Sequence, residues 1–239
     1  MKKIVAFTAF LMLLLTVAQA QDVRFGFQLS PAFSWMTSNT NKVNSSGTNL
    51  GLKLGMVGEY YFQENYAVTS GIGFFFNTGG TLLHERSGMF WSQSDLPTSC
   101  EELGPQGKLK YNLQYVEIPL GLKMRTREFG YIRYFFEPHI GFGFNTQANG
   151  DITSEGEQCQ DINIQKEVNL LNLFWGLNGG IEYSVSESTS LVGGVGMQFG
   201  FADTTDDSGG VVRLETGDLA DEKSKGVIRA FVIKLGVIF

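Results

Sequence analysis

Ten ionisable side chains lie within segments where apolar residues alternate with small or polar ones. They are Arg24, Lys53, Glu59, Glu117, Lys123, Arg133, Glu137, His139, Glu182 and Lys234. Five bases nearly balance four carboxylates, so these side chains could form ion pairs if the fold gathers them away from water. Glu117, Glu137 and His139 also have the residue types of an acid–base group. What they do depends on the elements that hold them.

The last segment, Gly226 to Phe239, shows what kind of element this is. Phe231, Ile233, Leu235, Val237 and Phe239 alternate with Ala230, Val232, Lys234, Gly236 and Ile238. A period of two predicts a β-strand, with one face fully apolar and the other carrying the charge.

The same alternation recurs earlier in the chain. The further predicted strands are Val23–Trp35, Asn49–Phe62, Tyr66–Asn77, Lys108–Met124, Tyr131–Asn145, Val168–Tyr183 and Thr189–Ala202. In this register the ten ionisable residues share the less apolar face. The apolar set changes parity near Tyr115, which predicts a β-bulge there. Pro31, Pro119 and Pro138 interrupt the strands and predict further bulges.

The connections alternate between long and short. The long ones are Met36–Thr48, Thr78–Gly107, Thr146–Glu167 and Asp203–Lys225, and tight turns join the remaining pairs. Strands joined in this way form an antiparallel meander that starts and ends on one side. The sequence therefore predicts an all-β, eight-stranded antiparallel up-and-down barrel.

Two kinds of barrel have this strand count. A soluble lipocalin-like barrel would turn its apolar face inward. Here the apolar face is bulky and aromatic, whereas the other face is rich in glycine and charge, so we expect a transmembrane barrel with lipid outside. Aromatic residues at both strand ends predict two interfacial girdles. An eight-stranded interior is filled by side chains, which predicts a packed ionic interior; a narrow ion path is the alternative.

The first residues have the pattern of an export signal. Lys2 and Lys3 precede an apolar run, Ile4 to Val17, and then Ala18-Gln19-Ala20. We expect residues 1–20 to be a cleaved signal peptide and residues 21–239 to form one barrel domain. The run is shorter than the roughly 20 residues of a spanning helix. The expected location is the outer membrane of a Gram-negative-type bacterium, with short periplasmic turns and long external loops.

The long loops carry the cysteines and much of the negative charge. Cys100 and Cys159 lie in different loops and could form a disulfide in an oxidising compartment; two free thiols are the alternative. The four loops hold sixteen acids and six bases, a net charge of −10. Acidic loops suit divalent cations or basic partners, but the Asp203–Glu222 cluster does not match an EF-hand, and a solvated loop is the simpler interpretation. Nothing indicates nucleic-acid binding.

Catalytic motifs are missing from the sequence. It has two histidines, His84 and His139, and no nucleophile elbow, zinc-ligand spacing or phosphate-binding loop. We therefore expect no enzyme and no cofactor or metal.

One segment resembles a known family. Tyr115-Val116-Glu117-Ile118-Pro119-Leu120-Gly121-Leu122-Lys123 is similar to a signature strand of PorT-like outer-membrane β-barrel proteins. The strand ends at Gly71–Asn77 and His139–Asn145 are similar too. The resemblance implies an eight-stranded outer-membrane barrel, and some members are secretion accessory proteins. The ending resembles that of outer-membrane proteins whose terminal Phe is read by the barrel assembly machinery, which implies that role for Phe239.

Three functions follow as hypotheses. We expect a monomeric, filled barrel whose external loops bind a partner protein or surface ligand, in a secretion or envelope accessory role. A small channel for ions or solutes is the first alternative. A lipid-modifying enzyme that uses a rim residue such as His84 is the second.

Overall fold

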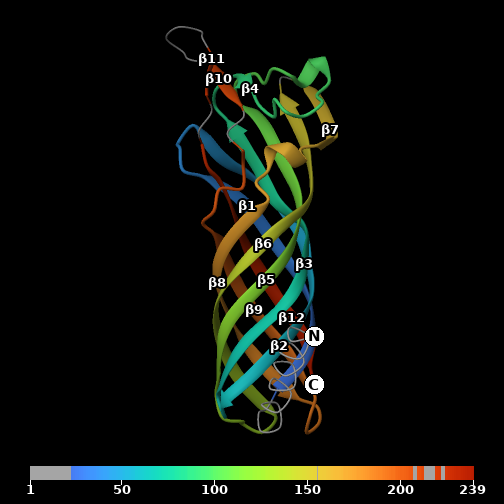
Figure 1. Cartoon of the computed structure of the whole chain (residues 1–239), viewed down its shortest axis with the longest axis vertical. Coiled ribbons are helices and arrows are strands. Elements are labelled where there is room, and N and C mark those ends of the chain that lie inside the picture. The colour runs from blue at the N-terminus through green and yellow to red at the C-terminus, as the bar shows by residue number, and fades with distance from the viewer. Residues whose placement is uncertain (1–22, 155, 207–208, 213–218, 222–223) are drawn as a thin grey trace, which may run out of the picture.

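The structure, a computed structural model, describes residues 23–154, 156–206, 209–212, 219–221 and 224–239. Its body consists of eight long strands: β1 Val23–Ser38, β2 Val43–Gln63, β3 Tyr66–His84, β5 Gly107–Arg125, β6 Ile132–Ser154, β8 Leu171–Ser184, β9 Ser190–Gly200 and β12 Gly226–Ile238. They form a tall barrel (Figure 1). The predicted signal peptide lies outside the described residues. No described helix is long and apolar enough to cross a membrane.

The strands form a closed ring. They pair antiparallel in the order β5-β3-β2-β1-β12-β9-β8-β6, and β6 returns to β5. The first and last strands meet, with Phe27 opposite Val237 and Phe33 opposite Phe231. Each long strand pairs with the next long strand in the sequence, whether a tight turn or a longer segment joins the two. The predicted eight-stranded antiparallel up-and-down barrel is confirmed.

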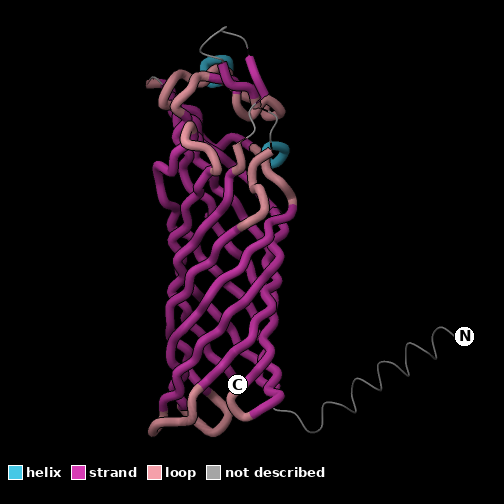
Figure 2. The backbone as a smooth tube through the Cα atoms, turned by 90° about the vertical axis from the view of Figure 1, so that its left-hand side faces the viewer, coloured by secondary structure: helices cyan, strands magenta, loops and turns pink. Residues whose placement is uncertain are grey.

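Smaller elements gather at the end away from the C-terminus (Figure 2). β7 (Glu157–Asn163) pairs with the end of β6, and β4 (Gly88–Met89), β10 (Gly210–Val212) and β11 (Leu219–Asp221) form a separate sheet. Two 3₁₀ turns, η2 (Thr98–Cys100) and η3 (Gln165–Glu167), lie among them. We call the described parts of residues 36–49, 78–113, 147–170 and 201–228 the outer head.

Strand length explains the outer head. β2 has 21 residues and β6 has 23, whereas β9 has 11. Since about 9–11 residues of tilted strand cross a bilayer, the long strands continue well past the membrane. The prediction that Met36–Thr48 and Thr146–Glu167 are loops is therefore wrong, as is the start of the loop at Thr78. These stretches remain extended because their backbones still pair, for example Asn44 with Leu83.

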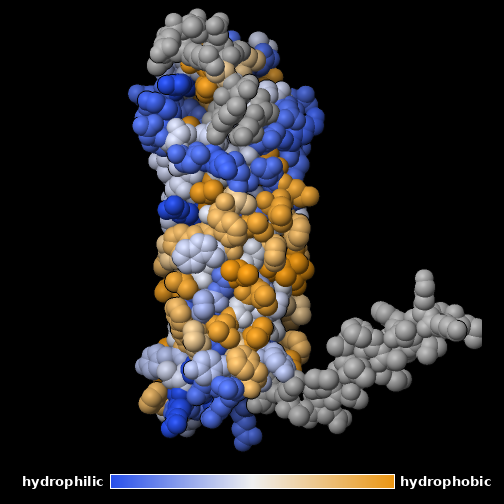
Figure 3. All heavy atoms as spheres, turned by 60° about the vertical axis from the view of Figure 1, so that its left-hand side comes forward, coloured by the Kyte–Doolittle hydropathy of each residue, from blue (hydrophilic) through white to orange (hydrophobic). Residues whose placement is uncertain are grey.

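The outside of the barrel body is apolar. Phe25 is 63% exposed, Leu50 62% and Ile140 53%. Figure 3 shows these residue types as an apolar belt between hydrophilic ends. In water such a belt would be an unusually large apolar patch, whereas against lipid it is the favoured arrangement.

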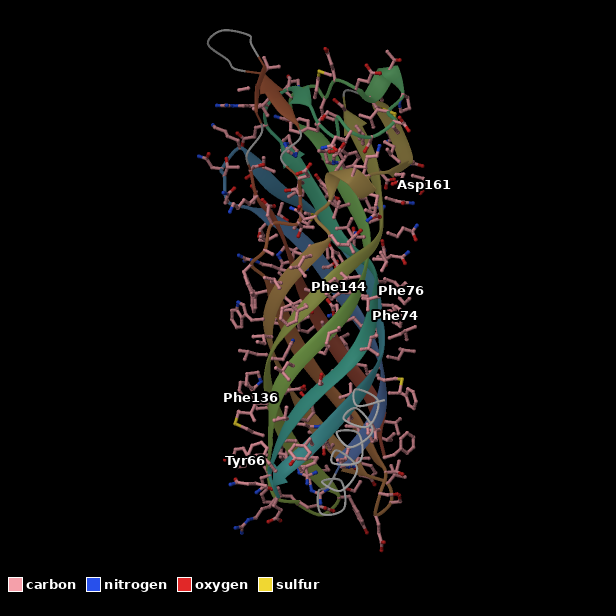
Figure 4. All side chains as sticks on the ribbon, in the orientation of Figure 1. Tyr66, Phe74, Phe76, Phe136, Phe144 and Asp161 are labelled. Atoms are coloured by element: carbon pink, nitrogen blue, oxygen red, sulfur yellow. A yellow bond between two sulfur atoms is a disulfide. The ribbon has the colours of Figure 1, made fainter. Side chains whose placement is uncertain are left out.

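Aromatic side chains lie towards both margins of this belt. Figure 4 shows Phe74 and Phe76 at the edge of the barrel, pointing away from it, with Phe144 at about the same level and Tyr66 near the tight turns. Phe74 and Phe76 stack with ring centroids 6.2 Å apart. This placement is consistent with the predicted girdles.

The strand pairing is irregular at the predicted bulge. The register shifts between Gln114 and Tyr115 where β5 pairs with β6, and a second shift lies where β3 pairs with β5. The extra residues belong to the partner strands: Thr146 on β6, and on β3 a site next to Asn77, whose φ is 53°. The predicted bulge lies near Tyr115, as expected, but on the neighbouring strands. In β5 itself, the same alternate residues face inward before and after Tyr115.

The strand prolines do not mark bulges. The register runs unbroken through Pro31, Pro119 and Pro138. The bulges predicted there are wrong, because a proline removes one hydrogen bond from the ladder without requiring an extra residue.

Candidate functional site

A buried ionic cluster fills the barrel near the tight turns. Lys123 on β5 lies 2.5 Å from Glu59 Oε1 on β2 and also pairs with Glu182 on β8. Arg24 Nη1 is 3.7 Å and Arg125 Nη1 3.9 Å from Glu182 Oε2. Three bases therefore surround two carboxylates, which is how charges are tolerated in a closed interior.

Aromatic and hydroxyl groups complete this cluster. Tyr61 donates its hydroxyl proton to Glu59 at 2.7 Å, and the guanidinium of Arg125 lies 3.9 Å from the Tyr61 ring centroid. Arg24 Nη2 donates to Ser190 Oγ at 2.9 Å. The arrangement joins β1, β2, β5, β8 and β9 across the interior.

A second ionic cluster lies in the middle of the barrel. Lys53 Nζ is 2.6 Å from Glu117 Oε2 and also reaches Gln198, whose Nε2 donates to Glu117 Oε1 at 2.9 Å. Lys234 Nζ is 2.5 Å from Glu137 Oε2. Two bases and two carboxylates neutralise one another here.

Polar neighbours hold the carboxylate of Glu137 in place. Thr69 donates to Glu137 Oε1 at 2.9 Å, and Asn178 Nδ2 lies 3.4 Å from Glu137 Oε2 and 3.3 Å from His139 Nδ1. A cavity of about 70 Å³ remains between the side chains of this cluster. That volume suits a few water molecules among polar partners.

Most of the predicted ionisable set meets in these two clusters, with one exception. Arg133 pairs with Glu128 of the tight turn rather than with an interior carboxylate. Its place in the interior network was wrong, because it stands at the start of β6, where water and the turn are within reach. His139 joins only through Asn178.

Sequence reasoning missed several members of the clusters. Arg125 was placed in a turn, and Tyr61, Thr69, Asn178 and Gln198 were passed over because they are uncharged or aromatic. Their inward parity was a usable signal: Arg125 follows Lys123 by two residues, and Tyr61 follows Glu59 by two.

The interior becomes apolar from Tyr115 of β5 into the outer head. Residues 109, 111, 113 and 115 of β5 are Leu, Tyr, Leu and Tyr, and each is at most 4% exposed. They join a core that includes Met36, Leu82, Trp91 and Ile152. Above the membrane, water lies outside the barrel, so the apolar residues turn inward as in a soluble protein. The expected polar interior is thus wrong for the outer head, which an apolar core fills.

A disulfide ties this core together. Cys100 of η2 is bonded to Cys159 of β7, with their Cα atoms 6.5 Å apart. Nearby, Gly88 and Leu103 exchange backbone hydrogen bonds of 3.0 and 2.8 Å. The segment before β5 is therefore held against the hairpin of β6 and β7, and the free-thiol alternative is wrong.

His84 is buried in the outer head. Its side chain is 4% exposed, and its ring centroid lies 4.1 Å from that of Phe90. Burial lowers the pKa of His84 to about 4, so the ring is neutral near pH 7. Its Nε2 has no hydrogen-bond partner among the described residues. Among the described residues, no three His, Cys, Asp or Glu side chains gather as metal ligands would.

Phe239 extends the pairing between β1 and β12, the first and last strands of the barrel. Phe239 donates its backbone N–H to Phe25 at 2.7 Å and accepts one at 3.2 Å, while its side chain is 54% exposed. Its side chain is thus accessible at the turn end of the barrel.

The sequence matches a family described as "Outer membrane protein beta-barrel domain" over residues 18–206. The chain belongs to this family. It is an integral protein of the outer membrane. No curated protein matches the sequence.

Solved structures of other outer-membrane proteins are similar at low identity. Neisserial surface protein A shares 9% identity with a TM-score of 0.44, over 90% of this chain and 95% of that one. OprG from Pseudomonas aeruginosa shares 10% with a TM-score of 0.43, over 92% and 97%. Ail, the attachment invasion locus protein of Yersinia pestis, shares 10% with a TM-score of 0.40, over 90% and 98%.

Proposed function

We propose that this protein is a non-enzymatic, filled outer-membrane barrel whose outer head binds a partner protein or a ligand at the cell surface. The observation that carries the proposal is the outer head itself. It has an apolar core, a disulfide and paired strands beyond the length that the bilayer requires.

Order in the outer head favours recognition over a spacer role. Ordering the backbone costs about 1–2 kcal/mol of conformational entropy per residue. Loops that only keep other molecules at a distance from the membrane do not need to be ordered. Preorganised surfaces bind better because that cost is met before the partner arrives. Glu167, which is 2% exposed, also accepts a hydrogen bond of 2.6 Å from the backbone of Gln93 and links two separate segments of the head.

The filled interior supports binding over conduction. The two ionic clusters occupy the barrel body, and the apolar core occupies the outer head. A porin-type aqueous pore needs a wider barrel of more strands.

The proposal also covers an accessory role, recognition of Phe239 during assembly and the oligomeric state. The resemblance of Tyr115–Lys123 to PorT-like strands favours an accessory role in secretion or in the envelope. Phe239, exposed at the turn end, suits recognition by the barrel assembly machinery during insertion. We propose a monomer, since the ring closes on its own strands.

Site-specific cross-linking tests the proposal. A photoreactive amino acid is placed at Glu101 or Gln158, both exposed on the outer head, and at Glu64 in a periplasmic turn as a matched control. After illumination of intact cells, we expect a discrete product from the two head positions and not from Glu64.

The disulfide provides the second arm of this test. The product should weaken when Cys100→Ser and Cys159→Ser loosen the outer head, while the amount of folded barrel stays the same. Identical products from Glu101, Gln158 and Glu64, or none from the head, would contradict a recognition role.

A further inference from the structure

A cleft of about 270 Å³ opens on the outer head, between the turn that joins β1 to β2 and the end of β3. Its charged lining residues are Lys42 from the turn and Arg86 from the segment after β3. His84 forms part of its wall, and Val43 and Val211 supply aliphatic surface. The cleft therefore combines cationic groups with a partly apolar lining.

Among the described residues, no carboxylate forms an ion pair with the two cationic groups of the cleft. Neither Lys42 nor Arg86 has a carboxylate within 4.0 Å among the residues that the structure describes. The adjacent acid, Glu85, accepts a hydrogen bond of 2.9 Å from Asn44 Nδ2. This cationic pair is unusual, because the four predicted loops carry ten more negative than positive charges.

Two buried donor positions at the cleft lack partners. Arg86 Nε and His84 Nε2 are shut off from solvent and have no hydrogen-bond partner within the described chain. A buried guanidinium N–H without an acceptor is strongly unfavourable. Rotation of these two side chains towards the cleft brings both nitrogens to an anion bound there.

The backbone around the cleft is held in place. Thr40 Oγ1 accepts the Lys42 N–H at 3.1 Å, and Lys42 O accepts the Glu85 N–H at 3.0 Å. Because the turn is fixed against β3, the backbones that carry Lys42 and Arg86 do not need to reorganise to meet a ligand.

We propose that this cleft binds a phosphate or sulfate group carried by a ligand at the cell surface. The guanidinium of Arg86 and the imidazole of His84 line the cleft from the end of β3, and the ammonium of Lys42 lines it from the β1–β2 turn. Three nitrogen-bearing groups suit an anion with three or more acceptor oxygens better than a carboxylate with two. Arginine and lysine form strong charge-assisted hydrogen bonds with such oxyanions. The inference rests on the proposed recognition function and gives its ligand a chemical class.

Calorimetry tests the proposal on the full protein in nanodiscs of uncharged lipid. The probes are inorganic phosphate, inorganic sulfate and glucose 6-phosphate, with acetate for comparison. We expect saturable binding of the first three to the wild type and none of acetate. Arg86→Gln should weaken binding about tenfold or more, since a charge-assisted contact is lost, and Lys42→Gln should act in the same direction.

Lys110→Gln is the matched control. Lys110 is a lysine of the same head whose Nζ lies 3.3 Å from Asp151, so its loss should leave anion binding unchanged. Equal weakening by Lys110→Gln and Arg86→Gln would show a general charge effect and overturn the proposal. Absence of saturable binding in the wild type would overturn it as well.

Imidazole NMR shows whether the anion reaches the cleft. With two histidines in the sequence, the spectrum is simple, and His139→Gln assigns the His84 signals. Phosphate should shift His84 Nε2 in the wild type and not in Arg86→Gln. An unshifted His84 signal at saturating phosphate would place the anion elsewhere and overturn the proposal.

Nanodiscs that contain an anionic phospholipid separate a lipid head group from a soluble ligand. Weaker binding of glucose 6-phosphate in these discs would identify the head group as a competitor for the same cleft, and unchanged binding would favour a soluble source. If purified protein binds none of the anions while head cross-linking still yields its product, this inference fails and the recognition function stands.

Discussion

Lys123 and Glu182 form an ion pair across the barrel interior, from strands that are not neighbours in the ring. Lys123 is on β5 and Glu182 on β8, with β6 between them. Both side chains are at most 2% exposed, and Lys123 also contacts Glu59 of β2. One ammonium group therefore connects three strands that backbone hydrogen bonds do not join directly.

Removing this ammonium group should destabilise the barrel strongly. Lys123→Met leaves two buried carboxylates without their shared partner, and we expect a loss of about 3–5 kcal/mol. Unfolding in urea, followed by the loss of the heat-modifiable band on gels, measures it. Lys110→Met, which removes an exposed pair with Asp151, should cost under about 1 kcal/mol. Equal midpoints for the two variants would contradict the structural role of Lys123.

The barrel should not conduct. Ionic clusters and an apolar core fill the described interior apart from small cavities, so purified protein in a planar bilayer is expected to give no resolved current steps. A porin added afterwards to the same bilayer controls for its quality. Reproducible steps that depend on protein concentration would favour the channel alternative instead.

Loss of the disulfide should loosen the outer head and spare the barrel body. Cys100 and Cys159 are 59 residues apart, and a cross-link of that span is worth about 2–5 kcal/mol. In the Cys100→Ser, Cys159→Ser variant, we expect faster hydrogen exchange in η2 and β7 and unchanged exchange in β9. Unchanged protection at η2 and β7 would show that the apolar core alone holds the head.

The bulge on β3 should depend on a residue that tolerates positive φ. Asn77 has a φ of 53°, and its Nδ2 donates to Leu50 O at 2.9 Å. Asn77→Val should lower stability by about 1–2 kcal/mol, because β-branched residues avoid this region. Asn77→Gly should recover most of the loss, as measured by thermal unfolding. A valine variant as stable as the glycine variant would contradict strain at this site.

Acid should weaken the outer head through His84. Burial lowers its pKa from 6.5 to about 4, so protonation favours the unfolded state. The contribution of neutral His84 is complete above pH 6.5 and is lost as the pH falls towards 4, on the order of 3 kcal/mol. His84→Phe should show a shallower loss of stability over this range in urea unfolding. Parallel pH profiles for the two proteins would contradict the shift.

The sequence alone determined the strand count, the ring order and the lipid-facing residues. A strand places alternate side chains on opposite faces, so a period of two with an aromatic face indicates both the element and its environment. The same parity brought Lys53, Glu117 and Glu137 to one interior. Strand count and facing are local features that residue spacing predicts, and the alternation of long and short connections predicts the ring order.

Only the tertiary structure decided where along each strand the inward-facing side chains change from charged to apolar. Leu109, Leu113 and Tyr115 share parity with Glu117 and Lys123 on β5, yet the first three form an apolar core and the last two form ion pairs. Alternation is the same in both halves of the strand. The medium outside changes from lipid to water as β5 leaves the bilayer, and the hydrophobic effect then turns apolar side chains inward. The position of that boundary depends on how far the neighbouring strands extend together, which no single segment of the sequence specifies.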